Sequence, residues 1–328
     1  MKLRKKCLFA GLTAAVLILP SGCSAVSSEP MTYTDTLFDS VISVQIYDSK
    51  DEEILDGCRD LCQEYDVKFS RTNEESEVSM INSAQGNPVE VSPETATLIK
   101  KGLYYGKLSD GAFDITIGSV SRLWDFKAEE PALPDQAALA EALQHVDYKK
   151  VVVEGNTVKL QDPAAALDLG AVAKGYIADL LKEYLEGEGV HHALINLGGN
   201  VLAIGGKPDG SAFNIGIQKP FDESGIPLTS VRIKDKSIVT SGTYQRYFEK
   251  DGTLYHHILD PYSGYPCNNG LASVSIITDS SLTADALSTT CFILGPEKGL
   301  ELVNQLDNVE AVFVDSEEKI TYSNNFQK

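Results

Sequence analysis

The chain has 328 residues, a formal net charge of −19 and 43% hydrophobic residues. This length fits one large globular unit or two modest ones, and the apolar fraction excludes a wholly disordered chain. The excess of acids argues against non-specific nucleic-acid binding, which needs clustered Lys and Arg side chains. Residues 1–22 carry four basic side chains and no acid, so removing them takes the net charge from −19 to −23. Because the protein's overall electrostatic field is negative and repels anions, an anionic ligand must be held by local groups.

The first 22 residues have the pattern of an export signal. A basic start precedes an apolar stretch at residues 8–19, which is too short to span a bilayer comfortably. Small residues directly before Cys23, and a polar segment after it, are similar to a bacterial lipoprotein cleavage site. We therefore predict a signal peptide at 1–22, a lipidated Cys23 with a tether to residue 33, and an extracytoplasmic body at 34–328 anchored to the cell membrane. An ordinary secretory signal with a chance cysteine is the alternative.

Hydrophobic periodicity predicts a mixed set of helices and strands in the body. Ser92 and Pro93 are residue types expected at a helix start, and Gly295 with Pro296 are types that end one. The predicted elements, in chain order, are a strand at 35–48, helices at 51–69, 92–108 and 131–143, a hairpin at 151–160, a helix at 172–185, strands at 193–204, 213–218, 231–233 and 237–239, a strand pair at 246–259, a strand at 272–277, and helices at 283–294 and 296–305. Because helices and strands do not alternate strictly, we expect an α+β fold with one continuous catalytic body, and a smaller lobe near 120–165 is compatible with it.

Four cysteines remain after the predicted processing: Cys58, Cys62, Cys267 and Cys291. Cys58 and Cys62 are four residues apart on a predicted helix, which usually means a shared buried face. No Cys or His spacing is typical of a zinc site. A Cys267–Cys291 bridge is compatible with the sequence, which does not establish it.

The segment at 281–290 (SLTADALSTT) is the strongest local signal for chemistry. If Thr283 caps the helix, Asp285 lies in its first turn and Thr289 one turn further along the same face. A carboxylate and a hydroxyl at this spacing are hard oxygen ligands suited to Mg²⁺. The same residues also fit an acid placed against the helix dipole and a threonine bonded to its own helix. On these ten residues alone the structural interpretation is the simpler one.

Two further segments bear candidate residues. Residues 168–175 (DLGAVAKG) predict a turn that opens a helix, where Lys174 could neutralise a phosphate. This segment matches neither a Walker A loop nor GxGxxG, and Gly170 could simply mark a tight turn. His256 and His257 are adjacent on a predicted strand, so at most one of them reaches a given site. A neutral imidazole is a natural general base for a hydroxyl, although a histidine bonded to a neighbouring backbone group is as simple a reading.

The order of the motifs is more specific than any one of them. They are FSR at 69–71, SEVS at 76–79, GAFDIT at 111–116, LWDF at 123–126, DLGAVAKG at 168–175, NLGGN at 196–200, TSGTYQRY at 240–247, HILDP at 257–261 and TADALST at 283–289. From residue 34 to the C-terminus, this series closely resembles the ApbE-like FAD:protein FMN transferases, a family of mostly exported lipoproteins. One departure is at residues 38–40 (FDS), where many members have a Met-Gly-Thr-like turn.

The resemblance implies an activity and a set of site residues. The family cleaves the pyrophosphate of FAD and links FMN through a phosphoester to a Thr or Ser of an acceptor protein, releasing AMP. Carried over to this sequence, Mg²⁺ would be held by Asp285, Thr289 and the backbone carbonyl of Ala171, and His257 would deprotonate the acceptor hydroxyl. The residues implied to contact FAD are Phe38, Ser70, Ala112, Phe113, Asp114, Asp168, Lys174 and His257.

The acceptors implied are flavin subunits of membrane redox complexes or extracytoplasmic flavoproteins. Two alternatives stay open: a hydrolase that converts FAD to FMN and AMP, and a lipoprotein that only binds FAD. A pure binder needs no proton acceptor, so the metal pair and His257 argue against it.

Overall fold

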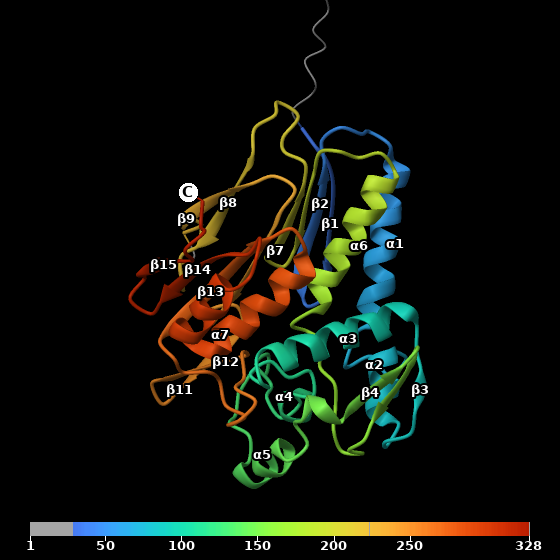
Figure 1. The fold of residues 1–328 in the computed structure, drawn as a ribbon, viewed down its shortest axis with the longest axis vertical. Coiled ribbons are helices and arrows are strands. Elements are labelled where there is room, and N and C mark those ends of the chain that lie inside the picture. Colours follow the sequence, from blue (N-terminus) through green and yellow to red (C-terminus); the bar gives the residue numbers. More distant parts are fainter. Residues whose placement is uncertain (1–28, 223, 328) are drawn as a thin grey trace, which may run out of the picture.

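The computed structural model describes residues 29–222 and 224–327, so the predicted signal peptide and Cys23 lie outside the described residues. Its centre is an eight-stranded sheet in the order β1-β2-β6-β7-β10-β13-β14-β15, with every neighbouring pair antiparallel (Figure 1). Its strands are β1 (Met31–Leu37), β2 (Ser40–Ile46), β6 (Ala193–Leu197), β7 (Asn200–Ile204), β10 (Ser237–Gly242), β13 (Leu271–Thr278), β14 (Glu310–Asp315) and β15 (Ile320–Tyr322). Strand β1 therefore begins inside the segment predicted as a tether.

Helices cover one face of this sheet and a β-hairpin covers the other (Figure 1). Ile42, Val44 and Ile46 on β2 are fully buried in the core shared with the helices, and each such burial contributes about 1.5–3 kcal/mol. A second core, which includes Phe213 and Ile238, lies between the sheet and the hairpin. The helices are α1 (Glu52–Lys68), α6 (Ala173–Gly187) and α7 (Ser281–Asn304), and the hairpin strands are β8 (Phe213–Gln218) and β9 (Pro227–Ile233).

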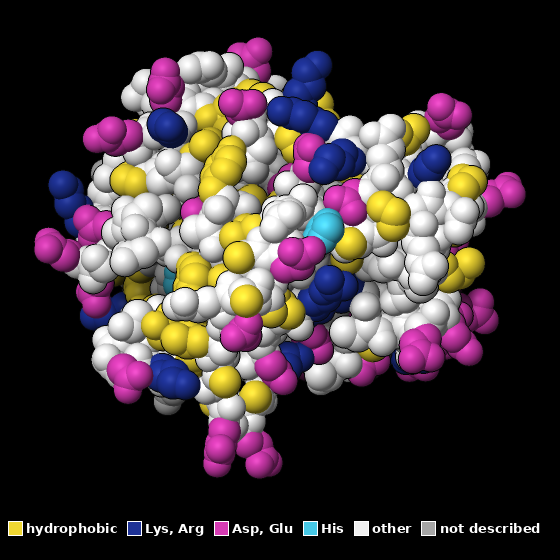
Figure 2. Space-filling model, turned by 90° about the horizontal axis from the view of Figure 1, so that it is seen from below, with side chains coloured by type: hydrophobic (Ala, Val, Ile, Leu, Met, Phe, Trp, Pro, Cys, Tyr) yellow, Lys and Arg dark blue, Asp and Glu magenta, His cyan; other side chains and the backbone are white. Residues whose placement is uncertain are grey.

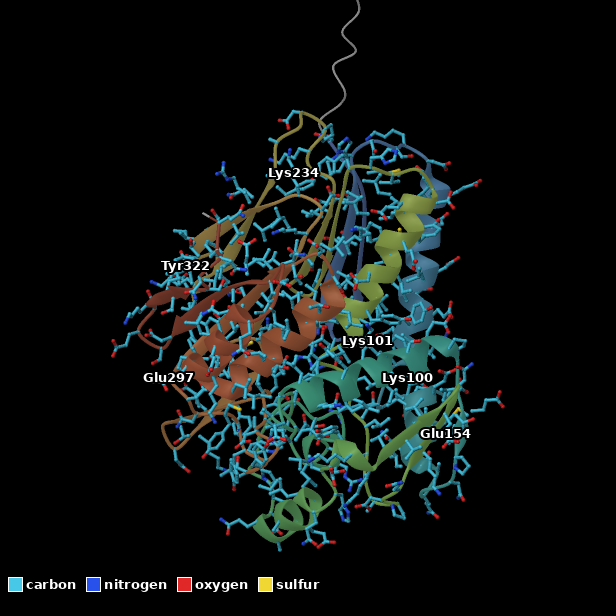
Figure 3. The ribbon with its side chains drawn as sticks, in the orientation of Figure 1. Lys100, Lys101, Glu154, Lys234, Glu297 and Tyr322 are labelled. Carbon is cyan, nitrogen blue, oxygen red and sulfur yellow. The ribbon has the colours of Figure 1, made fainter. Side chains whose placement is uncertain are left out.

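A smaller layer lies below the sheet in Figure 1. Lys100 on α3 donates from Nζ to the Gly155 carbonyl in the turn after Glu154 (2.9 Å), which ties this helix to a three-stranded sheet, β3-β5-β4 (Figure 3). The buried Trp124 donates from Nε1 to the Gly264 carbonyl (2.9 Å) at the centre of an aromatic cluster. The elements of this layer are α2 (Glu77–Ser83), β3 (Val89–Glu90), α3 (Pro93–Leu108), α4 (Gly118–Ser121), α5 (Gln136–Leu143), η1 (Tyr148–Lys150), β4 (Val151–Glu154), β5 (Thr157–Leu160), β11 (Tyr247–Lys250) and β12 (Thr253–His256).

The structure confirms the α+β class and many predicted elements. Helix α1 follows Asp51, whose carboxylate accepts from the Glu53 N–H (3.1 Å), and α3 begins at Pro93 after its cap Ser92. The hairpin at 151–160 is present as β4 and β5, and β8 has the predicted bounds. Helix α7 breaks at Gly295, where φ is 81°, as the Gly-Pro pair predicts.

Other predictions are wrong in extent. The single strand at 35–48 is two strands, joined by a turn at Phe38 and Asp39 with φ angles of 55° and 59°. Such turns normally carry Asn or Gly, so this hairpin has no sequence signal. The helix at 131–143 is confined to α5, which Asp135 caps. Helix α7 is capped by Ser280 rather than Thr283, which places Asp285 in its second turn. Elements α2, α4, β3, β14 and β15 lie outside the predicted set.

Charged side chains of both signs are interspersed over the face shown in Figure 2. Cys58, Cys62, Cys267 and Cys291 are free thiols, so the bridge that the sequence permits is not formed. Within residues 29–222 and 224–327, no helix is long and apolar enough to cross a membrane.

Candidate active site

A cleft of about 1360 Å³ contains most of the predicted site residues. It is lined by the β1–β2 turn, the start of α6, the first part of α7 and the loop that follows β12. Pockets for small ligands usually measure about 300–1,000 Å³, so this cleft has room for a ligand of dinucleotide size.

Two aspartates hold the starts of α6 and α7 together. Asp285 on α7 accepts through Oδ2 from the Gly175 N–H at the start of α6 (2.8 Å). Asp179 on α6 accepts in return from the N–H groups of Ser281 (2.7 Å) and Leu282 (3.0 Å) at the start of α7. Each carboxylate thus satisfies backbone donors that the other helix leaves unpaired.

Gly175 is the residue that permits this close contact. A Cβ atom at this position would lie 2.4 Å from the Ser281 carbonyl oxygen and 2.7 Å from the Asp285 Cβ. Any side chain would therefore push α6 and α7 apart and pull Asp285 away from its present position.

Asp285 is a buried carboxylate that the protein only partly compensates. Asp285 is only 4% exposed, and this burial raises the pKa of its carboxyl above the ordinary value. The Lys174 ammonium, the Gly175 N–H and the Asn200 amide oppose that shift. Although Asn200 lies beside the carboxylate, its Nδ2 atom is buried and completes no hydrogen bond. The site therefore contains an anion and a polar group that both lack a full set of partners.

Two further residues with oxygen ligands line the same cleft. Helix α6 begins at Ala173, so the Gly175 N–H has no acceptor within its own helix and bonds to Asp285, while Ala171 lies just before the helix and lines the cleft. Thr289 lines the cleft one turn after Asp285, with its Oγ1 3.1 Å from the Ser241 Oγ. A carboxylate, a hydroxyl and a carbonyl are donors that fit Mg²⁺. In the described part of the chain, no group of three or more His, Cys, Asp or Glu side chains is arranged so that it could hold a metal ion, and this mixed donor set does not require one.

Four basic side chains line the cleft of this strongly acidic chain: Arg71, Lys127, Lys174 and Arg246. Arg71 Nε lies 3.3 Å from Asp168 Oδ2, and Lys127 Nζ lies 2.6 Å from Asp39 Oδ1. Six aspartates also line the cleft, but Asp114 accepts from Thr116 and Tyr148 and is already engaged with the protein. The six aspartates outnumber the four basic side chains, so an anionic ligand would be met by individual cationic groups such as Lys174 rather than by a net positive cleft.

His257 is held neutral inside the cleft. Burial lowers its pKa to about 3, and the nearby positive groups of Arg246, His256 and Lys174 act in the same direction. Its Nδ1 atom is buried and makes no hydrogen bond. His256 points elsewhere, with its Nε2 2.9 Å from the Cys267 carbonyl oxygen, as adjacent strand residues should. His257 lines the cleft and His256 does not, which is consistent with the expectation that at most one of the pair reaches a given site.

The structure places the remaining predicted contacts around the same space. Phe38 lies at the tip of the β1–β2 turn, where its N–H donates to Asp66 Oδ1 (2.8 Å), and it lines the cleft. Ser70, Phe113, Asp114 and Asp168 also line it. Ala112 does not: it is buried behind the lining residues. The roles given to these residues stay predictions.

Three residues at this site lie outside the sequence-based set. Asp179 fixes the start of α7, Asn200 lies beside Asp285, and Ser241 contacts Thr289. The NLGGN and TSGTYQRY motifs contain Asn200 and Ser241, so the motif series offered a signal for these two. Asp179 belongs to no motif and has no local signal.

Comparison with known proteins agrees with this fold. Residues 38–313 match the ApbE family. The FAD:protein FMN transferase of Klebsiella pneumoniae (strain 342) is 39% identical over 295 residues, which cover 89% of this chain and 91% of that protein. The FAD:protein FMN transferase of Treponema pallidum (strain Nichols) is 36% identical, covering 80% of this chain and 77% of its own length.

Solved structures give the same result. The crystal structure of the ApbE protein of Thermotoga maritima superposes with a TM-score of 0.83 at 32% identity, covering 91% of this chain and 98% of that one. The flavin transferase ApbE of Vibrio cholerae superposes with a TM-score of 0.79 at 26% identity and the same coverage. The chain therefore belongs to the ApbE family.

Proposed function

We propose that this chain is a Mg²⁺-dependent FAD:protein FMN transferase, which cleaves FAD, releases AMP and joins FMN through a phosphoester to a Thr or Ser of an acceptor protein. The observation that carries the proposal is the convergence of Asp285, Thr289 and Ala171 with Lys174 and His257 in one cleft. Membership of the ApbE family, and the relatives named FAD:protein FMN transferase, support the same reaction.

The oxygens near Asp285 define where the metal would bind. Asp285, Thr289 and the Ala171 carbonyl would hold Mg²⁺, which when bound would withdraw charge from the pyrophosphate of FAD. Lys174, next to Asp285, would neutralise phosphate oxygens directly, and Asp168 would orient Arg71 toward the same ligand. Positioning and charge neutralisation are the main requirements of phosphoryl transfer, and these residues supply both.

His257 is the proposed general base. Because its pKa is about 3, the imidazole is neutral at pH 7 and has a ring nitrogen free to take the acceptor's hydroxyl proton. The acceptor oxygen then bonds to the phosphorus of the FMN half, and the bond from that phosphorus to the AMP oxygen breaks with its electron pair leaving on AMP. The negative charge of bound FAD would raise the pKa of His257, which makes it a stronger base when substrate is present.

The predicted lipid anchor adds a location to this activity. We propose that Cys23 is lipidated and holds the enzyme on the extracytoplasmic face of the cell membrane. Its acceptors would then be flavin subunits of membrane redox complexes or extracytoplasmic flavoproteins.

The proposal is tested by incubating residues 24–328 with FAD, Mg²⁺ and a candidate acceptor that carries a Thr or Ser flavinylation motif. We expect a yellow acceptor with covalently bound flavin and one AMP released per adduct. An acceptor whose target Thr is changed to Val should give neither adduct nor AMP. AMP without adduct would identify a hydrolase, and unchanged FAD would identify a binding protein. Either result would overturn the transferase assignment.

A further inference from the structure

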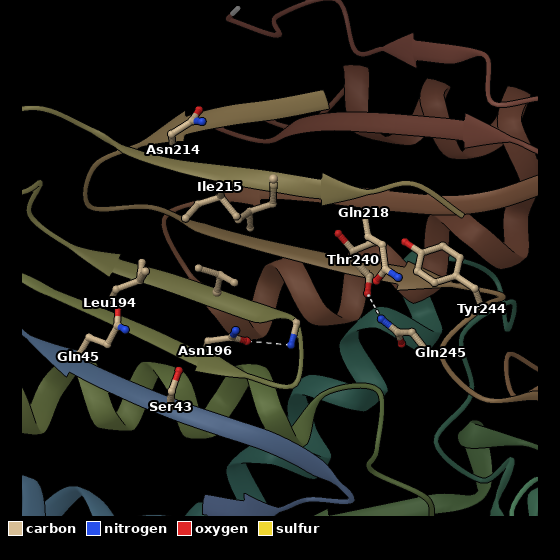
Figure 4. Close-up of a pocket in the computed structure, with 14 residues that line it drawn as sticks. Ser43, Gln45, Leu194, Asn196, Asn214, Ile215, Gln218, Thr240, Tyr244 and Gln245 are labelled. Carbon is tan, nitrogen blue, oxygen red and sulfur yellow. Dashed lines mark hydrogen bonds between the residues drawn. The ribbon is translucent and has the colours of Figure 1, made fainter. Parts of the chain in front are cut away.

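A second, smaller groove of about 400 Å³ lies on the sheet face that the helices do not cover. It runs between strand β8 and the strands β2, β6, β7 and β10 (Figure 4). Ser43 and Gln45 on β2 face it because they alternate with the buried Ile42, Val44 and Ile46. We call this feature the amide groove after its polar side chains, which include Gln45, Asn196, Asn214, Gln218 and Gln245.

Strand β8 presents its edge to the amide groove. Asn214, Ile215 and Gly216 all line it, although successive residues of a strand point to opposite faces. The groove therefore borders the edge of β8. Among the described strands, β8 pairs with β9 alone, so its outer edge has backbone N–H and C=O groups that join no other strand. Such an edge is a template for pairing with another extended chain.

The amide groove contains no charged side chain, in a protein with a net charge of −19. Its polar groups are amides and hydroxyls, with Leu194, Ile215 and Ile238 between them. Amides pair well with peptide N–H and C=O groups, and without a charged side chain they give no charge-assisted bond to a phosphate or a metal ion. The lining therefore suits a polypeptide backbone with small apolar side chains.

The groove opens into the active-site cleft. Gly199, Gln218, Thr240 and Gln245 line both spaces, and the Gln245 Nε2 donates to the Thr240 carbonyl at the junction (3.1 Å). Figure 4 shows Gln218, Thr240 and Gln245 together at one end of the groove, with Asn214 and Gln45 toward the other. A chain extended along β8 would therefore reach the cleft that contains His257.

We propose that the amide groove receives an extended segment of the acceptor polypeptide, next to its target Thr or Ser, as an added strand on the edge of β8. The six residues of β8 match about six residues of an extended partner, or roughly 20 Å. This inference rests on the proposed transferase function. It assigns the acceptor a path separate from the active-site cleft where FAD would bind.

The test uses the acceptor that becomes flavinylated by the unmodified enzyme. Gln45 and Asn214 line the groove but not the cleft, so the double variant Gln45→Ala/Asn214→Ala should leave FAD affinity unchanged. We expect the KM for the acceptor to rise about tenfold, the loss from removing one or two hydrogen bonds. Gln63→Ala, the same change on the exposed surface of α1, is the matched control and should leave that KM unchanged.

Hydrogen exchange gives a second measurement that does not depend on turnover. With the acceptor whose target Thr is changed to Val, the amides of residues 213–218 should become protected, and those of β15 should not. An unchanged acceptor KM in the folded double variant, or unprotected β8 amides, would overturn the proposal. Failure of the unmodified enzyme to form any adduct would instead refute the transferase function, and this inference with it.

Discussion

Replacing Asp285 by Asn should stabilise the protein while abolishing its affinity for Mg²⁺. The pKa of Asp285 is raised by burial, so the charged carboxylate destabilises the folded state at neutral pH. Asn retains an oxygen for the Gly175 N–H and removes the buried charge. Replacing a whole buried ion pair by neutral groups of similar volume is neutral or gains about 1–4 kcal/mol in measured cases, whereas removing one partner leaves the other charge uncompensated. Here the remaining charge, Lys174, lines the open cleft, where water can solvate it, and the weaker hydrogen bond to Asn returns about 1 kcal/mol of the gain. We therefore expect an increase of up to about 3 kcal/mol in the free energy of unfolding.

The assay is thermal unfolding of both proteins at several pH values, with and without Mg²⁺. Without metal, the variant should melt up to about 6 °C higher at pH 7. Its advantage should disappear on acidification, because below the ordinary carboxyl pKa Asp285 is protonated in the folded and unfolded states alike. Saturating Mg²⁺ should raise the Tm of the unmodified protein and leave that of the variant unchanged. If the variant is less stable than the unmodified protein at pH 7, and Mg²⁺ does not change the Tm of the unmodified protein, Asp285 is only a structural cap.

Three further substitutions test the site and the turn beside it. His257→Ala should bind FAD normally in a fluorescence titration, while the rate of acceptor flavinylation falls by about 10²–10⁴; an equal loss of FAD affinity would make His257 a binding residue. Gly175→Ala should lower the free energy of unfolding by about 1–3 kcal/mol, seen as a lower Tm, because the new Cβ meets the Ser281 carbonyl oxygen. Asp39→Gly should raise Tm by about 1–3 °C, since it relieves a positive φ worth about 1 kcal/mol and breaks only exposed ion pairs, to Lys127 (2.6 Å) and Arg246 (4.0 Å). A lower Tm in that variant would show that these ion pairs hold the turn.

The elements that the sequence predicts well have local causes. Ser92 and Pro93 predict the start of helix α3, and Gly295 with Pro296 predict the break in α7. The β1–β2 hairpin is missed because its turn uses Phe38 and Asp39 in a conformation that favours Gly or Asn.

At the site, spacing along one helix is predictable and pairing between helices is not. The four-residue interval from Asp285 to Thr289 places both in the cleft, although the predicted cap was off by three residues. The hydrogen bond from Gly175 to Asp285 joins positions 110 residues apart. Nothing in the sequence around Asp179 distinguishes it from other acidic residues on helices, because its role depends on the packing of α7 against α6. Such reciprocal capping depends on tertiary packing, so no local pattern encodes it.

The charge distribution separates the two substrates of the proposed reaction. An enzyme with a net charge of −19 repels FAD at long range, so the ligand must be captured by Arg71, Lys174 and a cation drawn to the undercompensated Asp285. Those same groups would also attract any acidic stretch of an acceptor protein and block the cleft with it. The uncharged amide groove avoids this competition, because hydrogen bonds to a backbone select an extended chain regardless of its charge. On this proposal the acceptor hydroxyl would approach the FMN phosphorus from the groove side, along a route separate from the groups that would bind FAD.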